Sequence, residues 1–385
     1  MKAPIKARGK GVWTCVVDLP RDANGKRRQR RHTFHGTKGD AENERSRIVH
    51  EVTSGAFVDS KRITVGEYLD WWLESCVKPR VAPRTFEGYE MIVKRHLEPA
   101  LGRIRLTKLN PLHVQEYEAK ALLEGRVGTR TALSKQTVLH HHRVLHAALE
   151  HAVKAGVTIR NPLDAVEPPK PERRSMTTLD VTEVGNLLAA AVGTRLLAPL
   201  HISIATGMRR GELLGLHWRD IDLAGRKLAV RWSLQTLKDE TGPILKAPKS
   251  GHSRTVTLPQ AAVAALIVHK KNQAAEKLLH GKDYQDNDLV FCEEDGRPWK
   301  PNAFTGHWDR FKRKQGLDIR WHDLRHTYAT LLLGQGVHPK VVQEALGHST
   351  IAITMDLYSH VTPNLQEEAA QKLDALLWGS QKASS

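Results

Sequence analysis

The chain has 385 residues, and its 59 lysine and arginine residues outnumber its 42 acidic residues, which gives a formal charge of +17. At roughly 100–200 residues per domain this length predicts two to four domains, and a composition of 40% hydrophobic and 26% charged residues excludes a disordered tail protein. No apolar run approaches the ~18 residues of a membrane span, and the N-terminus lacks a signal-peptide core. Three scattered cysteines exclude a disulfide framework, so we expect a cytoplasmic protein. Its positive charge predicts that it binds nucleic acid.

The first predicted domain, residues 1–62, carries nearly half of the excess positive charge. Its sequence predicts a strand over 11–19, a turn, a second strand over 26–34 that pairs back as a hairpin, and a helix over 38–52. Four arginines line the second strand: Arg27, Arg28, Arg30 and Arg31. Because arginine forks match guanine edges in a DNA groove, the pattern predicts a DNA-binding module; the alternative is an edge strand protected by charge.

Residues 63–166 are predicted to form an all-helical bundle. A capping box, Thr64 to Glu67, precedes the first helix, and proline and glycine residues separate the later ones. Five histidines fall in the last predicted helix, 134–155: His140, His141, His142, His146 and His151. The three consecutive histidines point around the helix, and the sequence offers no nearby acidic or sulfur partner, so we expect a solvated or DNA-facing surface and no metal site.

A proline-rich, charged stretch, 167–174, is predicted to be a linker to a third domain, 175–385. That domain is predicted to be mainly helical, with strands over 227–233 and 254–258. It has no glycine-rich phosphate loop, so we expect no nucleotide cofactor. The predicted class is multidomain α+β: a small N-terminal β-sheet with a helix, an all-α bundle, and a mainly α domain with a small antiparallel sheet.

Four clusters of polar residues stand in the third domain, at 205–218 (ATGMRRGELLGLHW), 249–258 (KSGHSRTVTL), 322–327 (HDLRHT) with 346–348 (LGH), and 354–360 (TMDLYSH). In this order and spacing they closely resemble the tyrosine recombinase (phage integrase) family, and the helical second domain resembles the family's core-binding domain. The resemblance implies a DNA recombinase with these catalytic residues: Arg209, Lys249, His322, Arg325, His348 and the nucleophile Tyr358.

Each residue type suits that chemistry. Breaking a DNA strand without metal or water needs a nucleophile, here the phenol of Tyr358, and neutralisation of charge on the phosphate. Arg209 and Arg325 are permanent cations whose forks can hold two phosphate oxygens. Lys249, expected on the turn of a hairpin, can protonate the leaving oxygen. The histidines His322 and His348 complete the cage as bases or donors, with their protonation left open.

Neighbouring residues offer alternatives to some of these positions. Arg210 stands beside Arg209 and Lys246 precedes Lys249, but the family pattern favours Arg209 and Lys249. His326 and Tyr328 are expected to be structural, and Glu212 is expected to orient an arginine or the hairpin. A final amphipathic helix over 364–378 is expected to dock either on its own domain or on a neighbouring protomer.

The predicted function is therefore site-specific integration and excision of a mobile element through a covalent 3′-phosphotyrosine. The resemblance implies double-stranded DNA as partner, at core sites and at arm sites, a homotetramer on that DNA, and a directionality factor, with no cofactor, metal or membrane. Three alternatives remain at this stage: a chromosome-dimer resolvase, which would lack the N-terminal module; a non-catalytic DNA-binding regulator; and a type IB topoisomerase without site preference.

Overall fold

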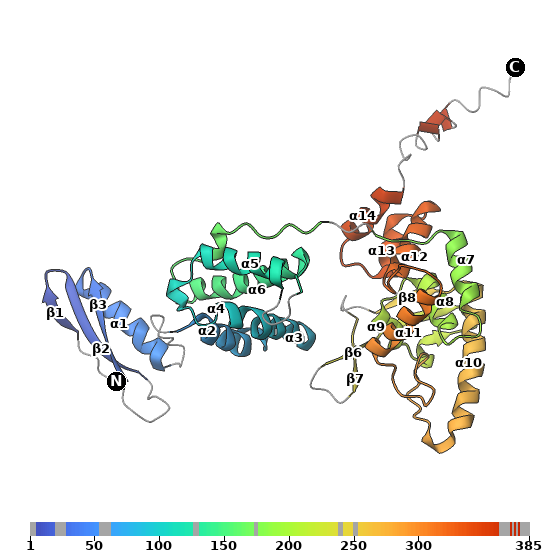
Figure 1. Cartoon of the computed structure of the whole chain (residues 1–385), viewed down its shortest axis with the longest axis horizontal. Coiled ribbons are helices and arrows are strands. Elements are labelled where there is room, and N and C mark those ends of the chain that lie inside the picture. The colour runs from blue at the N-terminus through green and yellow to red at the C-terminus, as the bar shows by residue number, and fades with distance from the viewer. Residues whose placement is uncertain are drawn as a thin grey trace. The chain divides into compact units, whose positions relative to one another are not determined.

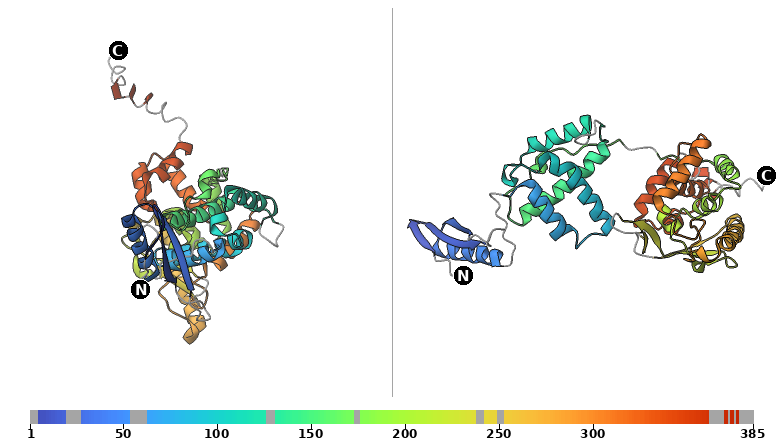
Figure 2. Two further views of the ribbon diagram at one scale, coloured as in Figure 1. Left: turned by 90° about the vertical axis from the view of Figure 1, so that its left-hand side faces the viewer. Right: turned by 60° about the horizontal axis from the view of Figure 1, so that its bottom comes forward.

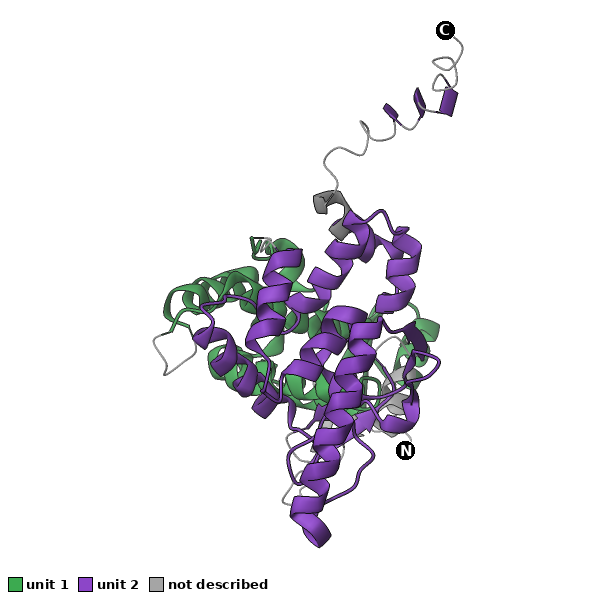
Figure 3. Cartoon of the chain, turned by 90° about the vertical axis from the view of Figure 1, so that its right-hand side faces the viewer, with its two compact units in different colours: residues 1–172 green, residues 173–385 purple. Residues whose placement is uncertain are grey.

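A computed structural model describes residues 5–19, 28–53, 63–125, 131–172, 176–237, 242–248 and 253–361, with short helical pieces at 370–371, 373–374 and 376–377. For 17–19, 28–30, 47–53 and 357–361 it describes the backbone alone. The chain forms two compact units, Met1–Glu172 and Arg173–Ser385 (Figure 3). The predicted α+β class with small antiparallel sheets is confirmed. A further division of unit 1 near residue 62 stays a prediction.

The N-terminal part of unit 1 is a three-stranded antiparallel sheet in the order β1-β2-β3, with one helix packed on it (Figures 1 and 2). The hairpin expected from the sequence is β2 with β3, and the register pairs Trp13 with Phe34. Cys15 and Ala41 are buried where the helix meets the sheet. The elements are β1 (Lys6–Gly9), β2 (Val12–Leu19), β3 (Arg28–His35) and α1 (Lys38–Thr53).

The rest of unit 1 is the expected helical bundle. The predicted capping box is confirmed, because the Thr64 backbone N–H donates to Oε2 of Glu67 (2.8 Å) and Glu67 N–H donates to Oγ1 of Thr64 (3.3 Å). Tyr68 and Leu145 are among the fully buried core residues. The main elements are α2 (Val65–Trp72), η1 (Leu73–Val77), α3 (Pro83–Ile92), η2 (Val93–Leu97), α4 (Glu98–Leu101), α5 (Pro111–Glu124) and α6 (Lys135–Lys154), with short 3-10 turns at Leu106–Lys108 and Pro162–Ala165.

The predicted solvated or DNA-facing surface was wrong for two of the α6 histidines, His141 and His142, whereas His140 is exposed. His141 is 1% exposed and lies 2.7 Å from the Tyr117 hydroxyl, and His142 is 7% exposed with Nδ1 2.8 Å from Oε1 of Glu118. Both partners lie on α5, 24 residues away in sequence, so a search for neighbours along the helix missed them. Within the ranges that the structure describes, no three metal-ligand residues gather at one point.

Unit 2 has a helical core around three aromatic residues. Trp321 meets Phe304 and Trp308 edge to face, with ring centroids 4.5 Å and 5.2 Å apart. The helices are α7 (Val181–Ala190), α8 (Leu197–Thr206), α9 (Arg210–Leu214), α10 (Gln260–His280), α11 (Pro301–Lys314), α12 (Asp323–Gly334), α13 (Pro339–Leu346) and α14 (Ile351–Val361), with 3-10 turns at Trp218–Asp220 and Gly281–Asp283. In the described parts of the chain, no helix combines the length and apolar character that crossing a bilayer requires.

The strands of unit 2 correct the hairpin expected around Lys249. They are β4 (Ile221–Asp222), β5 (Lys227–Val230), β6 (Ser233–Thr236), β7 (Pro243–Lys246) and β8 (Arg254–Thr257). β8 pairs with β5, whereas β7 pairs with β6, so the strands on either side of Lys249 have different partners. The two strands expected from the sequence therefore pair as predicted, but β6 and β7 intervene between them, so they do not form a simple hairpin; Lys249 itself lies outside the described residues.

Only fragments of the expected C-terminal helix are described. They are helical at 370–371, 373–374 and 376–377, and Leu373, Leu376 and Leu377 are exposed. The question of whether this segment docks on its own chain or on another falls outside the described residues.

Candidate active site

Arg209 lies where one helix ends and the next begins. α8 stops at Gly207, whose φ of 61° is the left-handed conformation that favours glycine. A side chain has no room there, because a Cβ would come within 2.4 Å of Leu346 and 2.7 Å of Tyr328. The chain then turns, and Arg209 becomes the N-cap residue of α9, with its backbone N–H donating to Oε2 of Glu212 (3.0 Å). This turn sets the direction of the arginine.

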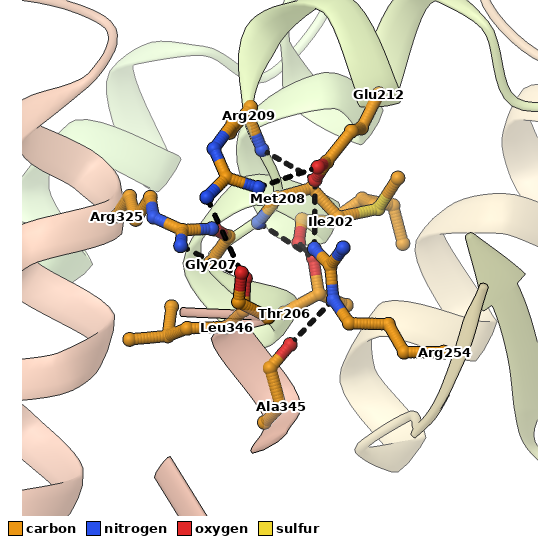
Figure 4. Close-up of polar contacts among 11 residues, drawn as sticks. Ile202, Thr206, Gly207, Met208, Arg209, Glu212, Arg254, Arg325, Ala345 and Leu346 are labelled. Carbon is orange, nitrogen blue, oxygen red and sulfur yellow. Dashed lines mark hydrogen bonds and ion pairs between the residues drawn. The ribbon is translucent and has the colours of Figure 1, made fainter. Parts of the chain in front are cut away.

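Glu212 is the buried carboxylate on which two arginines converge (Figure 4). Its Oε1 accepts a hydrogen bond from Nη1 of Arg209 (2.8 Å), and its Oε2 accepts one from Nη2 of Arg254 (2.7 Å). Burial raises the pKa of Glu212, but the hydrogen bonds and charges of Arg254 and Arg209 outweigh burial and hold this pKa below its ordinary value. The carboxylate is therefore ionised at neutral pH. It makes the contact with an arginine that the sequence predicts.

Arg325 comes from α12 and is 3% exposed. Its Nη1 donates to the Gly207 carbonyl (2.7 Å) and its Nη2 to the Leu346 carbonyl (2.8 Å), so it joins the ends of α8 and α13 (Figure 4). Burial, followed by the charge of Arg209, lowers the pKa of Arg325 to about 9. The guanidinium therefore keeps its charge at neutral pH, and its position is fixed by backbone acceptors.

Two imidazoles adjoin these arginines. His322 is the N-cap residue of α12, and His348 follows Gly347, which ends α13 in the left-handed conformation (φ 66°). Burial, together with neighbouring charges that include those of Arg325 and Arg209, lowers the pKa of both rings to about 4. Both histidines are consequently neutral at pH 7, with one N–H donor and one lone pair on each ring.

The described groups form a positively charged cluster. Two guanidinium groups, those of Arg209 and Arg254, contact one buried carboxylate, Glu212, and a third, that of Arg325, is held by backbone carbonyls (Figure 4). The charges of Arg209 and Arg325 both lower the pKa of His322 and of His348, so these four predicted site residues lie close together. Arg209 keeps 28% of its side chain exposed. Planar forks beside neutral imidazoles suit a phosphate group, which presents several acceptor oxygens.

The remaining predicted residues are covered in part. Tyr358 lies on α14, which packs against α12 and α13, but only its backbone is described. Lys249 lies wholly outside the described residues. In the N-terminal module, Arg28, Arg30 and Arg31 lie on β3, and Arg31 is exposed. Arg27 lies outside the described residues.

Sequence reasoning missed two residues near the cluster. Arg254, from β8, is almost fully buried, and its Nε donates to the Ala345 carbonyl (2.7 Å) in addition to its contact with Glu212. Thr354 is fully buried in α14 and contacts His348. Both stand inside the quoted clusters, but nothing in their local spacing marks a partner 42 residues away for Arg254 or a ring on the preceding loop for Thr354.

Comparisons with known proteins identify the family of this chain. Residues 177–364 match the phage integrase family, and residues 64–122 match the phage integrase N-terminal SAM-like domain. A protein of Caldanaerobacter subterraneus subsp. tengcongensis, named "Tyrosine recombinase XerC-like", is 31% identical over 96% of this chain and 97% of its own length. An "Integrase" of Saccharopolyspora erythraea is 27% identical over 96% of this chain and 95% of its own length.

Solved structures share the fold. An integrase of the Tn1549 transposon, in complex with a circular intermediate DNA, superimposes with a TM-score of 0.69 over 80% of this chain and 99% of that chain, at 21% identity. A lambda integrase dimer bound to a core site superimposes with a TM-score of 0.55 over 93% of this chain and 95% of that one, at 16% identity. The chain belongs to the phage integrase family. It is a tyrosine recombinase, an enzyme that cleaves and rejoins DNA.

Proposed function

We propose that the cluster around Glu212 is the recombination site, in which Arg209 and Arg325 hold the non-bridging oxygens of the scissile phosphate. The observation that carries this proposal is the meeting of two fixed guanidinium forks and two neutral imidazoles from separate elements. Charge that develops on the phosphorane is stabilised by donors that are already in place, and such preorganised stabilisation commonly lowers the barrier more than any other effect.

In the proposed reaction, the Tyr358 oxygen attacks phosphorus and the bond to the 5′ oxygen breaks, leaving a 3′-phosphotyrosine. The phenolic proton passes to a base, for which His322 and His348 each offer a lone pair at neutral pH. Lys249 protonates the departing 5′ oxygen. A 5′ hydroxyl from the partner strand then attacks the phosphotyrosine and releases the phenol. Each step exchanges one phosphoester for another, so the energy of the bond is conserved.

The N-terminal module is proposed to bind arm sites, while unit 2 and the helical part of unit 1 bind core sites. Support comes from the concentration of positive charge in residues 1–62 and from the exposed Arg31 on β3. A homotetramer on DNA in the host cytosol, assisted by a directionality factor, completes the proposal; among the structural relatives is a lambda integrase tetramer on a Holliday junction. Integration of a mobile element is favoured because a relative over nearly the whole chain is named an integrase, and chromosome-dimer resolution by the same chemistry is the second candidate.

A nicked core-site DNA that traps the cleaved strand tests the assignment. The core site can be sought in the DNA that adjoins the gene. The wild-type chain is expected to form a covalent protein–DNA adduct, and Tyr358→Phe is expected to form none, whereas the matched variant Tyr328→Phe, altered on α12, keeps adduct formation. Absence of an adduct with the wild-type chain would leave a DNA-binding regulator. Relaxation of any supercoiled plasmid would instead indicate a topoisomerase.

A further inference from the structure

A fully buried hydroxyl adjoins one of the two imidazoles. Thr354 has no exposed surface, and its Oγ1 lies 2.9 Å from Nδ1 of His348. Valine has nearly the same shape and carries no polar group. A buried hydroxyl is costly unless it is hydrogen-bonded. The hydrogen bond to His348 therefore compensates for the burial of the Thr354 hydroxyl.

The bond connects two structural elements. The backbone of His348 is held by α13, because its N–H donates to the Gln343 carbonyl (3.2 Å) and Nε2 of Gln343 donates to the His348 carbonyl (3.1 Å). The ring of His348 is held by α14 through Thr354. The imidazole therefore bridges the end of α13 and the helix in which Tyr358 lies four residues, about one turn, after Thr354.

We propose that Thr354 is a positioning residue for strand cleavage: its hydroxyl fixes the ring of His348 and ties that ring to the helix of Tyr358. With Nδ1 engaged by Thr354, Nε2 is the ring atom left for the phosphate. A hydroxyl both donates and accepts, so it supports either neutral tautomer of the ring. The inference rests on the proposed function, in which His348 and Tyr358 act on the same phosphate.

The first test is Thr354→Val, which removes the hydroxyl and keeps the branched shape. Under single-turnover conditions we expect the rate of adduct formation on the nicked core-site DNA to fall roughly tenfold, because a reacting group misplaced by a small distance slows the step. The affinity for DNA should stay unchanged. Thr354→Ser restores the hydroxyl and should restore the rate. Ile353→Val, an exposed neighbour on α14, is the matched control and should behave as wild type.

The second test removes the ring. In a His348→Ala background, Thr354→Val should cause no further loss, because the hydroxyl then has nothing to position. Equal rates for Thr354→Val and wild type, or independent multiplication of the two effects, would overturn the proposal. If Thr354→Val does not fold, Thr354→Ser and Thr354→Ala decide, since they differ by one oxygen: a slower Ala variant supports the proposal and equal rates refute it. A wild-type chain that forms no adduct would refute the proposed function itself, which is a separate outcome.

Discussion

Each unit of this protein has a pair of histidines in a polar setting, but the partners of the two pairs differ. In unit 1 the ring of His141 meets the Tyr117 hydroxyl, and the ring of His142 meets the Glu118 carboxylate. In unit 2 the rings of His322 and His348 lie under the influence of two arginines. The unit 1 histidines have hydrogen-bond partners within the helical bundle, whereas the unit 2 histidines lie beside excess positive charge.

The difference separates a structural role from a chemical one. A histidine paired with a carboxylate or a phenol inside a bundle has its hydrogen bonds completed by the fold. A neutral histidine beside guanidinium groups lies next to excess positive charge, and this charge favours the binding of an anion from solution. The residue type is the same in the two units, but His141 and His142 are buried whereas His322 is exposed and His348 is half-buried. Partner chemistry and exposure together carry the functional information.

The largest effect is expected at the arginine that supports the unit 2 cluster. Arg254→Met removes one of the two cations that contact buried Glu212, and breaking such a pair costs about 3–5 kcal/mol in the free energy of unfolding. Denaturant unfolding of unit 2 measures this loss. Arg297→Met, at an exposed arginine, is the control and should be neutral. An unchanged midpoint for Arg254→Met would show that Glu212 does not depend on this partner.

Arg325→Lys should separate chemistry from binding. The charge is kept but the fork is lost, so adduct formation should fall by about 10²–10³-fold while DNA affinity is maintained. Single-turnover cleavage and a DNA titration give the two quantities. A variant that cleaves at the wild-type rate would remove Arg325 from the proposed site.

In unit 1, removal of the carboxylate that pairs with a buried histidine should lower stability and leave the cleavage rate unchanged. Glu118→Leu leaves Nδ1 of buried His142 without its partner, which should lower the free energy of unfolding by about 1–3 kcal/mol. The folded fraction should still form the adduct at the wild-type rate. Loss of cleavage in the folded variant would contradict the structural role of this pair.

The pH dependence of stability gives the most specific effect, and for a change of one pH unit it is also the smallest. Burial, with the charges of His96 and His140, lowers the pKa of His141 from 6.5 to about 4. Between these values the unfolded chain binds a proton that the folded chain does not, so stability falls as pH drops from 6.5 towards 4, by up to about 1.4 kcal/mol per pH unit for this group. Hydrogen exchange of α6 amides should show this slope, and His141→Gln should reduce it. His35→Gln should leave it unchanged; equal slopes in both variants would contradict the prediction.

The sequence predicts local features well and distant partners poorly. The capping box at Thr64 depends on neighbours within a few residues, so it could be predicted directly from the sequence. The pairing of Glu118 with His142 and the contact of Arg254 with Glu212 join separate elements, and no periodicity marks them. The family pattern supplied the positions of Arg209 and Arg325, but not the reason that they are fixed.

The hairpin around Lys249 shows a second kind of limit. The sequence marks the two strands β5 and β8, but β6 and β7 intervene and pair with each other. Their short, mixed sequences carry too weak an alternation to predict both strands and register. The pairing of the strands that precede and follow Lys249 in the sequence could therefore be determined only from the structure.

Mapping the attachment point on the trapped protein–DNA adduct is the most direct test of Tyr358 as the nucleophile. Proteolysis of the adduct followed by mass spectrometry identifies the residue that carries the 3′-phosphate. We expect a single modified peptide, with the phosphate on Tyr358. Attachment to any other residue, or an adduct that forms equally in Tyr358→Phe, would contradict it.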